Sequence, residues 1–177
     1  MTATRHWRIR PWRPSAVLAV AVALAVILGA WGFQLIGGLP PCHLCLIERI
    51  PYYAGIPLAL AGIGVSYTAL PAAPLLTRIF IGLFVLAMLI SAGLGGYHAG
   101  VEWGWWAGPT TCTGTGTPGT GTVGDLIDQL GSASVVRCNE APIWILGLSL
   151  AGWNVLISLA LAALAARGAY GSSSTSQ

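Results

Sequence analysis

Four long stretches of the sequence contain no charged side chain, and this pattern constrains the fold more than any other feature. A helix needs about 20 apolar residues to cross the hydrocarbon core of a bilayer, so each stretch is long enough for one crossing. Only 7% of the residues are charged and 55% are apolar. This composition excludes an ordinary soluble enzyme, a nucleic-acid-binding protein and a disordered chain. The four stretches are residues 14–47, 50–77, 79–101 and 141–166.

We therefore predict an all-α membrane protein, a bundle of four transmembrane helices that forms a single membrane domain over residues 1–177. The predicted spans cover about 15–36, 49–70, 79–98 and 142–166. Extracytoplasmic loops then occupy about 37–48 and 99–141. The second of these is the long connection between the third and fourth helices.

The distribution of arginine predicts the orientation of the bundle. The N-terminal segment, the loop between the second and third spans and the C-terminal tail contain arginine but no acidic residue. Every acidic residue lies on the other side of the membrane. By the positive-inside rule, both termini are expected in the cytoplasm. In a bacterial inner membrane, the opposite loops then face the periplasm.

A cleavable signal peptide is the alternative for the first stretch. Its Arg-rich start fits a signal peptide, but its apolar run is longer than the roughly 7–15 residues of a signal h-region. Cleavage near Ala30 would also leave an odd number of spans. We therefore expect the first helix to be retained.

The chain has 4 cysteines, and all of them fall in the loops on the predicted periplasmic side. Cys42 and Cys45 form a C-x-x-C pair just before the second span, whereas Cys112 and Cys138 lie in the long loop. The periplasm is oxidising, so thiols there tend to be paired or redox-active. An even number of cysteines on this side predicts disulfide chemistry.

Other uses of these cysteines fit less well. A c-type haem needs His directly after the second Cys of the pair, and this position is Leu46. A zinc site favours two close pairs, whereas Cys112 and Cys138 are far apart, so we expect no metal. Two structural disulfides remain the main alternative. A C-x-x-C bridge closes a very short loop and gains little stability, which favours a redox-active pair.

Three residues near the predicted membrane boundary are candidates to act with the cysteines. If a helix begins near Cys45, Arg49 lies four residues later on the same face and favours the thiolate. A permanent charge there is costly without a purpose, although Arg49 could instead anchor the helix end beside Glu48. His98 ends the third span and is either functional or only a membrane-edge residue. His43, inside the pair, could stabilise a neighbouring thiolate.

The long loop has two recognisable parts. Residues 108–121 are rich in Gly, Thr and Pro, which predicts a mobile segment that could carry Cys112 between two partners. Residues 125–130 have the apolar spacing of a short amphipathic helix, which could lie on the membrane surface.

This combination resembles the DsbB family, membrane proteins that generate disulfides with quinone. The resemblance covers most of the chain, from the first span to the fourth. It depends on the C-x-x-C-x-x-E-R motif from Cys42 to Arg49, on the distant pair of cysteines in the loop, and on His98 at the end of the third span. The motif at a membrane boundary is far more specific than C-x-x-C alone.

The resemblance implies a reaction and roles for these residues. Cys112 and Cys138 would form the disulfide that meets a soluble DsbA-like oxidase, and Cys138 would then exchange with Cys42. Cys45 would pass the electrons to ubiquinone or menaquinone. The quinone site would include Arg49, Glu48 and His98.

Two other functions remain open. A structural or assembly protein in the lipid bilayer could use both disulfides only as staples. A thiol reductant that carries electrons outward should have a cysteine in the membrane or on the cytoplasmic side, and none is visible.

Overall fold

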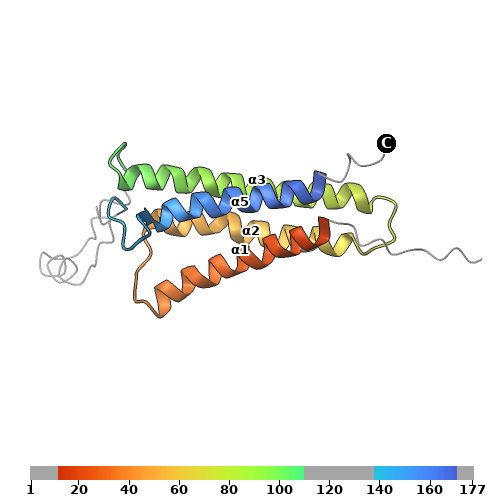
Figure 1. The fold of residues 1–177 in the computed structure, drawn as a ribbon, viewed down its shortest axis with the longest axis horizontal. Helices are drawn as coiled ribbons and strands as arrows, with labels where there is room; N and C mark the ends of the chain where they lie inside the picture. The colour runs from red at the N-terminus through yellow and green to blue at the C-terminus, as the bar shows by residue number, and fades with distance from the viewer. Residues whose placement is uncertain (1–11, 110–137, 171–177) are drawn as a thin grey trace, which may run out of the picture.

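The computed structural model describes residues 12–109 and 138–170, and within these ranges it forms a bundle of long helices (Figure 1). All 4 of its long helices are long and apolar enough to cross a membrane. A short antiparallel hairpin of β1 (Trp144–Ile145) and β2 (Leu148–Ser149) precedes the last helix. The predicted fold class is confirmed. The helices are α1 (Trp12–Leu35), α2 (His43–Val65), α3 (Ala73–Glu102) and α5 (Leu150–Tyr170).

The second helix begins at His43 and not at Arg49, which corrects the predicted boundary. Cys42 is its N-cap, and the Cys42 sulfur accepts a hydrogen bond from the backbone N–H of Cys45. Glu48 therefore lies inside the helix and does not mark its edge. The prediction failed because a charged side chain was taken as the end of a span, whereas this one is buried against partners from other helices.

The fourth helix begins at Leu150 and not at Pro142, because the hairpin occupies the residues between them. Leu146 and Gly147 both have positive φ, as the two central residues of a tight hairpin turn require. The indole of Trp153 donates to the Ile145 carbonyl at 2.9 Å and ties the hairpin to α5. The third helix also runs on past His98 as far as Glu102.

The core of the bundle is apolar and tightly packed. Phe84 and Met88 of α3 are fully buried in a cluster to which all the long helices contribute. At Gly55 of α2, an added Cβ would lie 3.2 Å from the Phe84 ring, so this glycine permits close packing of α2 on α3. Large apolar side chains such as Leu86 are exposed on the outer faces, as expected for contact with lipid.

Several predicted features lie outside the described residues. These are Cys112, most of the Gly- and Thr-rich segment 108–121, the predicted amphipathic helix at 125–130, and Arg137 beside Cys138.

Candidate active site

One end of the bundle brings together residues that are far apart in the sequence. The start of α2, the end of α3, the start of α5 and the C-terminal end of α1 all lie at the left end of Figure 1. Consecutive helices run antiparallel, so the C-x-x-C pair of α2 meets the last turns of α3. The candidate site is built at this end.

The C-x-x-C pair lies at the N-terminus of α2. Cys42 is buried, Cys45 is partly exposed, and both thiols are free. The Cys42 sulfur accepts the Cys45 backbone N–H at 3.1 Å, a position where the helix dipole favours negative charge. The neighbouring Cys45 side chain lowers the pKa of Cys42 most, and the Cys45 N–H adds to this, while burial opposes them. These contacts favour the thiolate form of Cys42.

His98 connects the cysteine pair to a buried carboxylate. Its Nε2 lies 3.6 Å from the Cys42 sulfur, and its Nδ1 lies 2.5 Å from Glu48 Oε1. The other carboxylate oxygen, Oε2, accepts a hydrogen bond from Asn154 Nδ2 at 2.8 Å. A carboxylate held in this way fixes the orientation of the imidazole.

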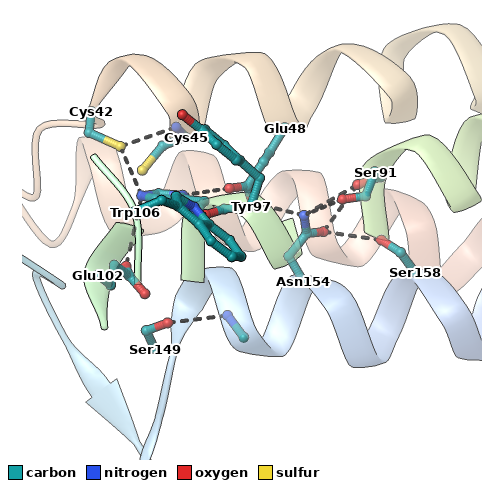
Figure 2. Close-up of polar contacts among 12 residues, drawn as sticks. Cys42, Cys45, Glu48, Ser91, Tyr97, Glu102, Trp106, Ser149, Asn154 and Ser158 are labelled. Carbon is teal, nitrogen blue, oxygen red and sulfur yellow. Dashed lines mark hydrogen bonds and ion pairs between the residues drawn. The ribbon is translucent and has the colours of Figure 1, made fainter. Parts of the chain in front are cut away.

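Asn154 extends this arrangement into the centre of the bundle. Its Oδ1 accepts hydrogen bonds from the Tyr52 hydroxyl at 3.0 Å and from the hydroxyls of Ser158 and Ser91. Figure 2 shows this row of polar groups leading away from the cysteines. Asn154 was not among the predicted site residues. The available signal was a strongly polar amide within a stretch that otherwise suits a membrane span.

Glu102 is a second residue that the sequence analysis missed. Its side chain is 2% exposed, and its Oε1 lies 3.8 Å from His98 Nε2. Its other oxygen, Oε2, is buried and has no hydrogen-bond partner among the described residues. Because α3 was predicted to end at His98, Glu102 was assigned to the loop, whereas it lies one helical turn further on the same face.

Arg49 points toward α1. Its Nη1 donates to Gln34 Oε1 at 2.8 Å and its Nη2 donates to the Ala30 carbonyl at 3.4 Å. The guanidinium also lies 5.7 Å from the centre of the Trp31 ring. Arg49 therefore does not pair with Glu48, whose carboxylate bonds to His98 and Asn154 instead.

A cavity of about 520 Å³ opens beside these groups, between α1 and the other helices. In Figure 1 the C-terminal end of α1 diverges from the bundle at this place. The walls include apolar side chains such as Phe33 and Ile157. The volume falls within the range of about 300–1,000 Å³ that is usual for small-molecule sites. Its polar lining includes Cys45, Glu48, Arg49, His98, Glu102 and Asn154.

The family model for the disulfide bond formation protein DsbB matches residues 12–167, which is most of the chain. The chain belongs to the DsbB family. It is therefore a multi-pass membrane oxidoreductase of disulfide bond formation, as the resemblance of its motif implied. No curated protein and no solved structure matches it. The DsbB-family match includes every cysteine of the chain.

The structure groups the predicted residues in two sets. Cys45, Glu48, Arg49 and His98 all line the cavity. Cys42 instead shares a small apolar cluster with Cys138, which is 1% exposed and disulfide-bonded. His43 is exposed, and Cys112 lies beyond the described ranges. The roles of these residues in the DsbB-family reaction stay predictions.

Proposed function

We propose that this membrane oxidoreductase reoxidises a periplasmic DsbA-like thiol oxidase and delivers the electrons to a membrane quinone. One observation supports the proposal: the C-x-x-C pair lies between Cys138 and the cavity. Cys42 belongs to the apolar cluster that contains Cys138, and Cys45, which packs against that cluster, also lines the cavity. Such a pair can receive electrons through Cys42 and release them through Cys45.

The cavity suits a quinone. Its walls are largely apolar, as the ring and tail of such a molecule require, and it has the volume of a small-molecule site. Arg49 lines it and carries N–H groups from which a quinone carbonyl oxygen can accept a hydrogen bond. A quinone can accept two electrons and two protons. The residues proposed to hold it are Arg49, Glu48 and His98.

The exchange begins at the loop disulfide. The thiolate of the reduced partner would attack Cys112, forming a mixed disulfide and releasing the Cys138 thiolate. With Cys42 and Cys45 joined as a disulfide, the Cys138 thiolate would attack Cys42. A Cys42–Cys138 bond then forms, the Cys42–Cys45 bond breaks, and Cys45 leaves as a thiolate on the cavity side. The pairing of Cys138 with Cys112 is part of this proposal.

His98 has two roles in the proposal. Its Nε2 is 3.6 Å from the Cys42 sulfur and can exchange a proton with it when the pair changes redox state. Glu48 holds the ring through Nδ1 and stabilises the imidazolium that results. Removing two electrons from the dithiol as a disulfide forms also releases two protons, so a base beside the sulfurs is needed.

The test follows the absorbance of a quinone after reduced partner is added to the full-length protein in detergent. Arg49→Ala is expected to raise the quinone concentration needed for half-maximal rate by about 10-fold or more, as the loss of a charge-assisted hydrogen bond predicts. Arg78→Ala, at the opposite end of α3, is the matched control and should behave as the parent. If the parent protein shows no quinone-dependent absorbance change, the proposal is wrong.

The alternative function, a protein stapled by two disulfides, predicts a different redox state. Stapled cysteines stay oxidised when quinone is depleted, whereas the proposed enzyme accumulates reduced Cys42 and Cys45. Alkylation of thiols in membranes with and without quinone separates the two.

A further inference from the structure

Cys42, Cys45 and His98 place their sulfur and ring-nitrogen atoms within 4.8 Å of one another. Thiolate sulfur and imidazole nitrogen are the preferred ligands of zinc and similar soft cations. We propose that the reduced Cys42–Cys45 pair and His98 form a three-residue binding site for a divalent cation of the zinc class, with the buried Glu102 carboxylate close to His98.

The distance between Cys42 and His98 fits tetrahedral coordination. Zinc lies about 2.3 Å from sulfur and about 2.0–2.1 Å from imidazole nitrogen, so the tetrahedral angle sets sulfur and nitrogen about 3.5 Å apart. The Cys42 sulfur and His98 Nε2 are 3.6 Å apart. The two cysteines are separated by two residues, which is the ligand spacing common in structural zinc sites.

The surroundings of His98 also suit a metal ligand. A neutral imidazole that donates Nδ1–H to Glu48 keeps its Nε2 lone pair toward the sulfurs. A carboxylate behind a histidine is the usual outer-shell partner at zinc sites, where it sets the tautomer and the ring orientation. Asn154 in turn holds the second oxygen of Glu48.

Glu102 supplies an independent observation. Its side chain is 2% exposed, its Oε1 lies 3.8 Å from His98 Nε2, and its buried Oε2 has no partner among the residues that the structure describes. A buried carboxylate oxygen without a partner is unfavourable. A cation bound by the cysteines and His98 would bring a positive charge near this carboxylate, and Cys45, His98 and Glu102 line the cavity, which provides an entry path.

The site depends on redox state. A disulfide between Cys42 and Cys45 removes both thiolates, so only the reduced protein should bind the cation. Zinc was not expected from the sequence because Cys112 and Cys138 are not a close pair, but His98 supplies a third ligand from another helix. The proposal is independent of the quinone and of the protein partner, since binding is measured without either.

The test titrates Co²⁺ into the full-length reduced protein in detergent, with Cys112→Ser and Cys138→Ser so that Cys42 and Cys45 supply the only thiols. We expect one Co²⁺ per chain, with a sulfur-to-cobalt charge-transfer band and the intense visible bands of tetrahedral cobalt. Zn²⁺ should displace it. Oxidation of the pair should abolish binding.

Variants then identify the histidine. His98→Ala should weaken Co²⁺ binding by more than about 100-fold, beyond the 10–100-fold typical of outer-shell changes. His43→Ala is the matched control, because His43 lies between the two cysteines but is exposed, and it should titrate as the parent. Glu48→Gln should weaken binding by about 10-fold, which tests the outer shell without removing a ligand.

Three results would overturn the proposal. The first is parent-like affinity in His98→Ala, and the second is equal binding by the oxidised protein. The third is a titration without a charge-transfer band. If His98→Ala loses its helical circular dichroism, Glu48→Gln decides, since unchanged affinity in that variant contradicts the arrangement.

Discussion

In the middle of the bundle, Phe84 and Met88 are buried among apolar side chains, whereas at the cysteine end Glu48 and His98 are buried against each other. Packing stabilises the first region, and any lost atom leaves a cavity. The second is unfavourable in a membrane unless every polar group has a partner. We infer that the apolar region carries stability and the polar region carries chemistry, so substitutions in the two should separate stability from turnover.

The largest expected effect on turnover comes from Cys45→Ser. Cys45 lines the cavity, and serine cannot form the disulfide that the proposed reaction needs. Reoxidation of a reduced DsbA-like partner should fall to the rate without enzyme, while the unfolding midpoint of the protein stays that of the parent. If this variant keeps parent-like turnover, the C-x-x-C pair takes no part in the reaction, and the polar end does not carry the chemistry.

The largest expected effect on stability comes from Phe84→Ala. Phe84 is fully buried, and its loss should lower the free energy of unfolding by about 2–3 kcal/mol. This is less than the roughly 3–5 kcal/mol of soluble cores, because lipid also solvates the exposed ring. Leu86→Ala is the control, since Leu86 is 53% exposed on the same helix. The measurement is denaturant unfolding in micelles, and the rate per folded molecule should stay at the parent value.

The comparison between the two regions also explains what the sequence could predict. The helices and their order follow from stretches without charge, because a bilayer admits few charged groups and requires backbone groups to bond within each helix. The helices of the apolar region can therefore be predicted without knowing which residues they contact. The C-x-x-C-x-x-E-R motif likewise indicates the family from local residues alone.

The details of the polar end depend on partners from other helices. The start of α2 was misplaced because Glu48 was read as a boundary, while His98 and Asn154 hold it inside the bundle. Glu102 was missed for the same reason, since only its contact with His98 shows that it belongs to the site. A single sequence shows a charge but not the group across the bundle that neutralises it.

A smaller effect on turnover is expected from Asn154→Ala. This change leaves Glu48 Oε2 without its 2.8 Å hydrogen bond and loosens His98. Turnover should fall by about 10-fold, which corresponds to a loss of about 1.4 kcal/mol from a bond to a charged group. Ser158→Ala is the control, because Ser158 contacts Asn154 and Tyr52 but has no bond to Glu48. Equal losses in both variants would mean that the whole polar row acts only in packing.

The smallest expected effect concerns how the rate of Cys42 alkylation depends on pH. The neighbouring Cys45 side chain lowers the Cys42 pKa, so the thiolate persists to lower pH than in an ordinary thiol. In the reduced protein, alkylation of Cys42 by iodoacetamide should therefore reach half its maximal rate below the ordinary thiol value of about 8.5. Cys45→Ala should move this midpoint upward, and mass spectrometry of the Cys42 peptide gives the rate at each pH.

The sign of the Cys42 shift also has a consequence for stability. A lowered pKa in the folded state stabilises the fold above the unfolded pKa, and this contribution is lost as the pH falls through the folded value.

In the alkylation experiment, His43→Ala is the control, because His43 is exposed and is not among the causes of the shift. If His43→Ala moves the alkylation midpoint as far as Cys45→Ala does, the thiolate depends on an exposed neighbour. The reactivity of Cys42 would then depend on the exposed His43 and not on buried groups at the polar end.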